Sequence, residues 1–286
     1  MVRTKTTPHR VHSYVKEDYN ISSKGFKHCD FSTLSEISII KQSLEQRGHS
    51  VILLGNYEKV YNMFLEKKFP SVDIVLNTAE GIVSRNREGW LPSLFEINHI
   101  PYSGSDAYTL GLTLNKAHTK IIANYLGIPT PDFYIVNKID DIMSIPACEL
   151  LTEDHQPLLC ESYISGREFA TSILYDSRKS KCIGTVEIVR KSGANIHIFS
   201  AEDKYSDTCT KIPAAIPENL LRHIEEDTIR LHRFLECNDY SRADYRIDSY
   251  GNYYFLELTP LPNIDHALIL FDIAPTIVGN VKGKLP

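Results

Sequence analysis

The chain has 286 residues, a formal net charge of −5 and 42% apolar residues. This is the composition of a globular protein, and it excludes a largely disordered chain. No apolar run approaches the roughly 20 residues that a membrane helix needs, and the polar N-terminus lacks the apolar core of a secretory signal. The acidic balance argues against nucleic acid as a partner. We therefore expect a cytoplasmic protein of two or three domains, without membrane or nucleic-acid partners.

The six cysteines are scattered and contain no C-x-x-C pair, so neither a zinc site nor a disulfide framework is expected. Residues 1–30 carry little pattern. They form either a loose tail or a first strand around residues 11–15.

Residues 35–106 alternate between helix and strand patterns. Ile37, Ile40 and Leu44 recur at helical spacing, and Gly48 ends that run. Apolar strands are expected at 51–54 and 72–76, with a helix at 60–65 between them. Strands that alternate with helices imply a parallel sheet with covered faces, so this part predicts an open α/β lobe.

The second half mixes helices with strands. A helix is expected at 114–125, followed by a strand at 133–136 and an irregular stretch at 137–156. The next apolar segments predict a pair of strands at 158–163 and 168–174, and a further strand at 181–190. A long amphipathic helix is expected at 219–234.

Residues 242–259 have the pattern of a β-hairpin centred on Tyr250 and Gly251. A symmetric hairpin places Asp244 opposite Glu257, and Arg242 opposite Thr259. Because side chains alternate along a strand, one face is expected to be polar and the other apolar. The polar face then carries Arg242, Asp244, Arg246, Phe255, Glu257 and Thr259.

Two carboxylates opposite each other repel, so something must compensate their charge. Arg242 and Arg246 can neutralise them on a solvated face. Alternatively, a hard cation such as Mg²⁺ can lie between them, because such ions prefer oxygen ligands. The spacing alone leaves both explanations open.

Several ordered motifs now resemble one family, the D-alanine–D-alanine ligases of the ATP-grasp superfamily. The resemblance runs from about Ser35 to Pro262. It rests on these segments: Asn77-Thr-Ala-Glu-Gly81, Arg85-Asn-Arg-Glu88, Pro101-Tyr-Ser-Gly-Ser-Asp106, Leu112-Thr-Leu-Asn-Lys116 with Thr119-Lys120, Gly127-Ile-Pro-Thr-Pro131, Glu161-Ser-Tyr-Ile-Ser-Gly-Arg-Glu168, Asp203-Lys-Tyr205, Arg242-Ala-Asp244 and Glu257-Leu-Thr-Pro-Leu-Pro262.

The resemblance implies an α/β (α+β) protein with ATP-grasp architecture. Its three lobes would be an open α/β lobe at 1–113, a reduced central lobe at 114–174 and a C-terminal lobe with an antiparallel sheet at 175–286. ATP would convert one carboxylate to an acylphosphate, and an amine would then displace phosphate to form an amide, a peptidoglycan precursor. The substrates would be small amino acids and the cofactors ATP and Mg²⁺, with Mn²⁺ as an alternative; a homodimer stays open.

The resemblance also implies roles for single residues. Arg242 would steady the acylphosphate, Lys204 would lie near the transferred phosphate, and Glu36 would hold the first substrate's amino group. The nucleotide would contact Lys116 through its phosphate, Glu161 with the Ser162 and Ile164 backbone through its base, and Glu168 through its ribose. Asp244, Glu257 and Thr259 would bind the metal, and Tyr205 would line the substrate pocket.

The chain departs from the family in its central lobe. Pro131 and Glu161 are only 30 residues apart, with Lys138 but no glycine between them. The family's second phosphate lysine, glycine-rich loop, strands and helix need roughly 42 residues. We therefore expect 137–156 to be a connector with a short helix at most. Thr259 replaces a metal-binding asparagine, Asn263 a glycine and Leu268 a substrate-contacting serine.

Three hypotheses follow. The protein is a working carboxylate–amine ligase, or a shortened, catalytically impaired relative that acts as a binding or regulatory protein, or an ATP-grasp ligase with substrates other than D-alanine. The retained cations and carboxylates favour the first, while the missing lysine and loop favour the second.

Overall fold

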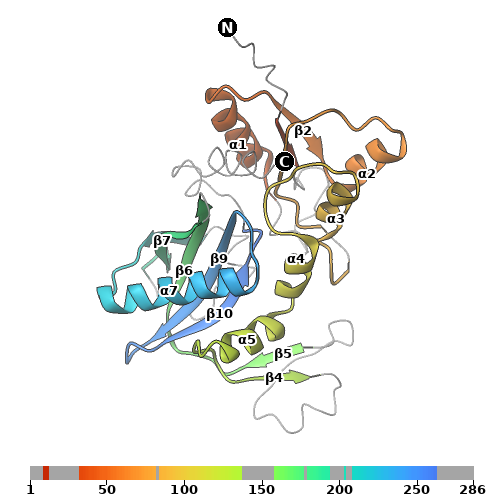
Figure 1. The fold of residues 1–286 in the computed structure, drawn as a ribbon. Helices are drawn as coiled ribbons and strands as arrows, with labels where there is room; N and C mark the ends of the chain where they lie inside the picture. The colour runs from red at the N-terminus through yellow and green to blue at the C-terminus, as the bar shows by residue number, and fades with distance from the viewer. Residues whose placement is uncertain are drawn as a thin grey trace.

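The computed structural model describes residues 9–12, 32–81, 84–136, 158–176, 179–193, 203 and 208–262. Figure 1 shows an N-terminal lobe, a two-stranded ribbon and a larger antiparallel sheet. The predicted connector at 137–156 lies outside the described residues. Within the described part of the chain, no helix has the length and apolar character needed to cross a bilayer.

The N-terminal lobe is built on a parallel sheet with strand order β2-β1-β3. Strand β1 covers His9–His12, β2 covers Val51–Gly55 and β3 covers Val75–Asn77. Helices α1 (Leu34–Gln46) and α2 (Tyr57–Leu65) alternate with these strands. The predicted parallel α/β lobe is confirmed. Its middle strand comes from residues 9–12, so the first-strand alternative for the N-terminus is the correct one.

Three further helices follow, and two of them were not predicted. Helices α3 (Trp90–Ile97) and α4 (Ala107–Thr113) precede α5 (Lys116–Tyr125). The helix predicted from residue 114 therefore begins two residues later. The side chain of Asn115 accepts hydrogen bonds from the backbone of Ala117 and His118, which caps α5 and separates it from α4.

The two strands after α5 form a ribbon of their own. Strand β4 (Phe133–Val136) pairs antiparallel with β5 (Leu158–Glu161). The predicted pairing of residues 158–163 with 168–174 is wrong, because the second segment belongs to another sheet. The residues between them, 162–165, therefore link two sheets and do not form a hairpin turn.

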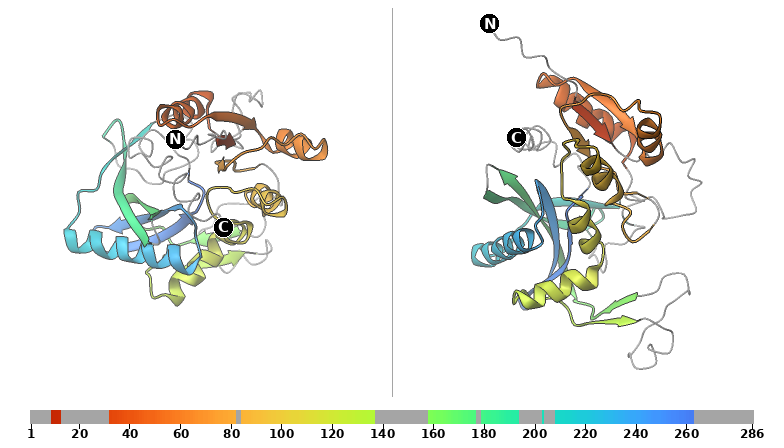
Figure 2. Two further views of the ribbon diagram at one scale, coloured as in Figure 1. Left: turned by 45° about the horizontal axis from the view of Figure 1, so that its top comes forward. Right: turned by 45° about the vertical axis from the view of Figure 1, so that its right-hand side comes forward.

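The larger sheet has the order β10-β9-β6-β7-β8 and is antiparallel throughout. Its strands are β6 (Gly166–Asp176), β7 (Lys179–Arg190), β8 (Cys209–Pro213), β9 (Tyr240–Asp248) and β10 (Tyr253–Thr259). Strand β6 runs across the expected lobe boundary between residues 174 and 175. Helix α7 (Glu218–Phe234) lies across one face of the sheet, as Figure 2 shows.

The core lies between α7 and the apolar face of this sheet. Ile224 and Leu231 on α7 pack with Ala243, Tyr245 and Ile247 on β9, and all five are buried. Helix α5 lies against the edge strand β10 and adds its own small apolar side chains to this core. The other face of the sheet carries Arg242, Asp244 and Arg246, and it is there that the candidate site lies.

The hairpin of β9 and β10 has the predicted register at the carboxylate pair and differs beyond it. Asp244 pairs with Glu257 and Arg242 with Thr259, whereas a β-bulge shifts the register by one between Phe255 and Glu257. Because a shift of one residue moves a side chain to the other face, Phe255 is fully buried in the core. Its predicted place on the polar face is therefore wrong.

The N-terminal lobe meets the larger sheet through the segment just before β9. The Asp239 carboxylate accepts a 2.8 Å hydrogen bond from the Gly104 N–H, and the Tyr240 hydroxyl donates to the Asn77 carbonyl at 3.1 Å. The Ser105 hydroxyl accepts from the Asn238 N–H. Two of the sequence motifs, around residues 77–81 and 101–106, thus supply contacts between lobes.

Candidate active site

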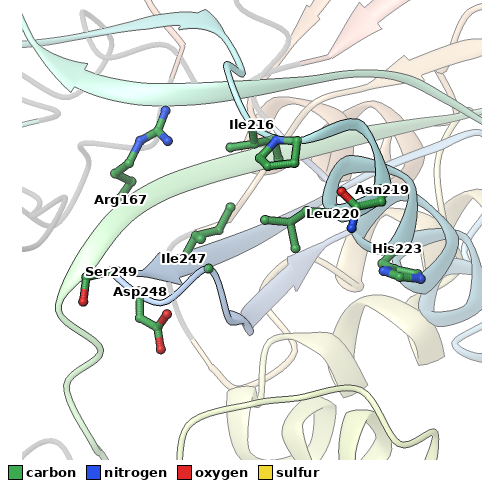
Figure 3. A pocket seen from close by; sticks show the side chains of 10 residues that line it. Arg167, Ile216, Asn219, Leu220, His223, Ile247, Asp248 and Ser249 are labelled. Carbon is green, nitrogen blue, oxygen red and sulfur yellow. The ribbon is translucent and has the colours of Figure 1, made fainter.

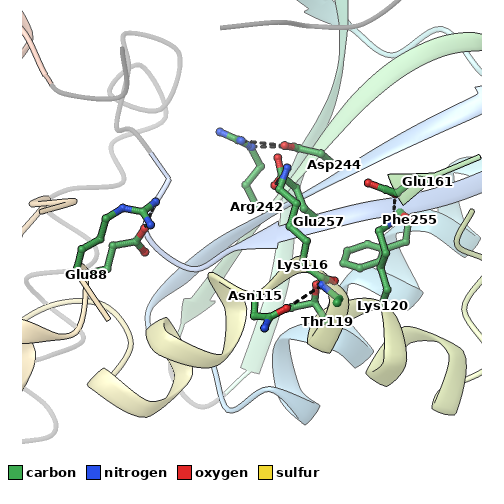
Figure 4. Close-up of polar contacts among 12 residues, drawn as sticks. Glu88, Asn115, Lys116, Thr119, Lys120, Glu161, Arg242, Asp244, Phe255 and Glu257 are labelled. Carbon is green, nitrogen blue, oxygen red and sulfur yellow. Dashed lines mark hydrogen bonds and ion pairs between the residues drawn. The ribbon is translucent and has the colours of Figure 1, made fainter. Parts of the chain in front are cut away.

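A pair of carboxylates forms the centre of the polar face. Asp244 and Glu257 lie directly opposite each other on β9 and β10, and Asp244 is buried. Each carboxylate has its own cation, as Figure 4 shows. Lys116 Nζ lies 2.6 Å from Glu257 Oε2, while Arg242 binds both oxygens of Asp244 at 2.8 and 2.9 Å.

This arrangement answers part of the question that the spacing left open. Arg242 does neutralise Asp244, whereas Arg246 binds Glu168 at 3.1 Å. The second cation is Lys116, which comes from α5 and not from the hairpin. The charges of the carboxylates are thus balanced by side chains from two different elements.

The donor set also fits a magnesium ion. Mg²⁺ is commonly held by one or two protein carboxylates together with substrate phosphates and water. Asp244 and Glu257 supply two such carboxylates, and Thr259 lies two pairs further along, opposite Arg242. The described residues contain no cluster of three or more His, Cys, Asp or Glu side chains suited to a metal. Phosphate oxygens would therefore have to complete the shell.

Lys116 lies at the first position of α5, where the Asn115 cap fixes the start of the helix. Desolvation alone would lower the pKa of Lys116, but the carboxylates of Glu257, Glu161 and Asp244 outweigh it and raise that pKa. Lys116 is consequently a firmly charged group beside the carboxylate pair. It is half-exposed, so a bound anion can reach it.

A second lysine on the same helix face was not predicted as a site residue. Lys120 is one turn from Lys116 and is completely buried, and its Nζ lies 2.5 Å from Glu161 Oε1. It also donates to the Thr130 hydroxyl at 3.0 Å and to the Phe255 carbonyl at 3.4 Å. In the sequence only its place in the Thr119-Lys120 motif pointed to it.

The segment from Glu161 to Glu168 links the ribbon to the larger sheet, and the resemblance assigned the base and ribose to it. Its Ser162 N–H donates to the Asp132 carbonyl at 2.8 Å, so this N–H is already used within the protein. At the far end Glu168 is buried against Arg246. Arg246 also donates to the Gly166 carbonyl and lies over the Tyr163 ring.

Of the remaining predicted residues, Glu36 has a clear structural role. Its carboxylate accepts hydrogen bonds from the Thr33 N–H and hydroxyl, which completes a capping box at the start of α1. Its predicted contact with a substrate amine stays a prediction. Lys204 and Tyr205 lie outside the described residues. Their neighbour Asp203 is buried and bound by Arg190 at 2.8 Å.

A separate hollow of about 430 Å³ lies between the start of α7 and the turn of the β9–β10 hairpin (Figure 3). Ile216, Leu220 and Ile247 form its apolar wall, and none of the predicted site residues lines it. Its strongest polar group, Arg167, is already bound by Glu187. The hollow is therefore distinct from the candidate site and contributes no residue to it.

Comparison with known sequences agrees with the resemblance. The family profile described as "D-ala D-ala ligase C-terminus" matches residues 135–271. The D-alanine–D-alanine ligase of Aquifex aeolicus is 26% identical, over 81% of this chain and 85% of that protein. The protein of the same name from Wolbachia pipientis subsp. Culex pipiens is 27% identical, over 87% and 86%.

Comparison with solved structures agrees on the fold. The D-alanine–D-alanine ligase of Bacillus anthracis, crystallised with ATP, has a TM-score of 0.68 at 17% identity, over 97% of this chain and 99% of that one. The VanG D-Ala:D-Ser ligase of Enterococcus faecalis also reaches 0.68, at 14% identity, over 97% and 100%. The predicted mixed α/β fold of ATP-grasp type is thereby confirmed. The chain is thus similar to D-alanine–D-alanine ligases in both sequence and fold.

Proposed function

We propose that the protein is an ATP-dependent ligase that joins the carboxylate of one amino acid to the amine of another, with D-alanine as the first substrate to test. One observation carries this proposal: two facing carboxylates, each balanced by its own cation, lie on one face of the sheet. Such a cluster suits phosphoryl transfer, in which the protein mainly positions charged groups and neutralises them. The names of the curated relatives support D-alanine.

The reaction has two steps. An oxygen of the first substrate's carboxylate attacks the γ-phosphorus of ATP, so that an acylphosphate forms and ADP leaves. The amine of the second substrate then attacks the acyl carbon, an amide forms, and phosphate leaves with a proton released. In both steps negative charge develops next to groups that must stay cationic, and Lys116 and Arg242 are placed to meet this need.

The same side chains suggest how the site is assembled. Asp244, Glu257 and Thr259 would hold Mg²⁺, which when bound supplies charge neutralisation for the phosphates. Lys116 would leave Glu257 and turn to a phosphate oxygen, and Arg242 would contact the acylphosphate. Glu161 and the Ser162 and Ile164 backbone would bind the base, and Glu168 the ribose. Lys204 would serve the transferred phosphate, with Tyr205 and Glu36 at the substrates.

No comparison favours the hypothesis of a catalytically impaired relative. That hypothesis rested on the short interval between Pro131 and Glu161, which lies mostly outside the described residues. A division into lobes at 1–113, 114–174 and 175–286 is part of the proposal, as are a cytoplasmic location and Mg²⁺ as the metal, with Mn²⁺ as its substitute.

The direct test is phosphate release by the full chain with ATP, Mg²⁺ and D-alanine, together with chromatographic detection of the dipeptide. Reactions that lack one component, and reactions with D-serine, D-lactate or L-alanine as the second substrate, serve as controls. We expect phosphate and dipeptide in equal amounts, and only with all components present. Phosphate release without any amide product would contradict the proposal. An amide formed only with another substrate would correct the substrate and keep the reaction class.

A further inference from the structure

Two buried cations hold the two ends of the segment 161–168. At its start the carboxylate of Glu161 binds Lys120 on α5, and at its end the carboxylate of Glu168 binds Arg246 on β9. The Lys120 side chain is fully buried and that of Arg246 is 5% exposed. Lysine and arginine side chains are rarely buried in proteins unless they are paired. Each of these two cations therefore needs its carboxylate, and the two carboxylates fix both ends of the segment.

The surroundings of Lys120 form a complete cage for an ammonium group. An ammonium has three N–H donors, and three acceptors surround this one: Glu161 Oε1, Thr130 Oγ1 and the Phe255 carbonyl. Thr130 donates its own proton to the same Phe255 carbonyl at 2.8 Å, so its hydroxyl oxygen is free to accept from Lys120. Burial lowers the pKa of Lys120, and the charge of Glu161 opposes this shift.

The cage joins three elements that the sequence keeps far apart. Lys120 comes from α5, Glu161 from the end of β5, and Phe255 from the bulge in β10. The Phe255 N–H donates to the Pro129 carbonyl at 2.7 Å, which ties the bulge to the loop after α5. The bulge thus turns the Phe255 carbonyl to a place where both Lys120 and Thr130 can use it.

Only one of the two carboxylate oxygens of Glu161 binds Lys120. Oε1 binds Lys120, whereas Oε2 makes no hydrogen bond to any residue that the structure describes, and the side chain is 29% exposed. An ionised carboxylate accepts hydrogen bonds and donates none. The base opposite such a group must offer a donor.

We infer that Lys120 is a positioning residue for base selection: it fixes Glu161 as a charged acceptor, so that the site prefers a purine with an amino group at C6 to one with a carbonyl there. This inference rests on the proposed function, in which Glu161 faces the base. Adenine offers the amino group and guanine the carbonyl, whose oxygen the carboxylate repels. Lys120 therefore acts on the nucleotide through Glu161, without touching it.

The test compares K120M, E161Q and the double variant with the full wild-type chain. Calorimetric titration with ATP and with GTP, each with Mg²⁺, gives both affinities, and steady-state assays give KM and kcat. We expect K120M to weaken ATP binding about tenfold, as the loss of a charged hydrogen-bond partner does, and to leave GTP binding nearly unchanged. The KM for D-alanine should stay within about twofold of the wild-type value.

Two features separate this role from simple stabilisation. First, if Lys120 acts through Glu161, K120M added to E161Q should change the ATP-to-GTP preference little further, so the two effects are non-additive. Second, R230M is a matched control, since Arg230 ties α7 to the end of α5 on the other side of the sheet. It should lower stability and leave the nucleotide preference unchanged. K120R should restore part of the preference that K120M loses.

The inference is overturned if K120M keeps the ATP-to-GTP preference, or if its effect adds fully to that of E161Q. Should K120M fail to fold, E161Q decides, because it leaves the buried lysine in place and must itself lose the preference. Binding is measured apart from turnover. A wild-type chain that binds ATP but forms no amide would contradict the proposed function and leave the base-selection test intact.

Discussion

Asp244 and Glu257 face each other across β9 and β10, and each is bound by a cation from a different element. Like charges directly opposite each other destabilise a sheet. Arg242 and Lys116 remove that penalty, and a metal with phosphates would take over their task when the substrates bind. The cluster therefore suits a site whose charges are exchanged during each turnover.

Replacing Asp244 tests the role of the carboxylate pair. D244N keeps the shape of the side chain but removes the charge, so Mg²⁺-dependent phosphate release should fall by about 100-fold or more, as with loss of other groups that stabilise charge in the transition state. E187Q is the matched control, because Glu187 lies on the opposite face of the same sheet and is also paired with an arginine. An equal loss of activity in E187Q would assign the effect to stability of the sheet.

Replacing Lys116 should have opposite effects on two ligands. Its ammonium binds Glu257 at 2.6 Å, so it would compete with a metal for that carboxylate. K116M should therefore bind Mg²⁺ alone more tightly, and bind ATP with Mg²⁺ about tenfold more weakly because a charge-assisted contact is lost. Calorimetry measures both affinities, and K41M, on the exposed face of α1, serves as the control. If both affinities changed in the same direction, Lys116 would not exchange Glu257 for a phosphate as proposed.

The stability of the fold should fall in mild acid because of one buried histidine. His232 on α7 is 1% exposed, its Nδ1 shares a 2.7 Å hydrogen bond with the Ser241 hydroxyl, and burial lowers its pKa to about 4. Unfolded, the imidazole titrates near its ordinary pKa of about 6.5, so the unfolded chain takes up the proton first. The contribution of the neutral His232 to the free energy of unfolding is therefore complete above pH 6.5. It is lost as the pH falls toward 4, and the loss is about 3 kcal/mol at most.

Urea unfolding between pH 7 and 4.5 measures this effect. H232Q should unfold with a shallower dependence on pH than the wild type, whereas H223Q, which changes an exposed histidine of the same helix, should match the wild type. Equal pH dependence in H232Q and the wild type would show that other groups cause the acid sensitivity.

The contact between the lobes should depend on the buried Asp239. Its carboxylate accepts from the Gly104 N–H, and its backbone has a φ of 60°, which asparagine tolerates better than most residues. D239A should lower the free energy of unfolding by about 1–3 kcal/mol, because it leaves a buried N–H without its partner. D239N keeps an acceptor oxygen and should lose less. A D239A protein as stable as the wild type would mean that this contact contributes nothing.

The sequence was most informative where the pattern was local. The alternation of polar and apolar residues in the hairpin was enough to place Asp244 opposite Glu257. It was not enough for Phe255, since a bulge is set by packing and by the backbone bonds to Pro129, which lies far away in the sequence. Likewise, β5 and β6 looked like neighbours because they follow each other along the chain, yet they pair in different sheets.

Residues whose role depends on distant partners could not be predicted. Lys120 is indistinguishable from a surface lysine until Glu161, Thr130 and Phe255 come together around it. The same holds for the pairing of Lys116 with Glu257. Charge, motif order and strand alternation are properties of the chain, whereas these contacts arise only once it has folded.

The most direct test of the proposed reaction follows an oxygen atom. D-alanine labelled with ¹⁸O in its carboxylate is incubated with the enzyme, ATP and Mg²⁺, and the released phosphate is examined by mass spectrometry. If an acylphosphate forms, the phosphate leaves with one oxygen of that carboxylate, so one ¹⁸O per phosphate is expected for each dipeptide. Unlabelled phosphate would show that water attacked ATP directly, and it would contradict the ligase reaction proposed for this site.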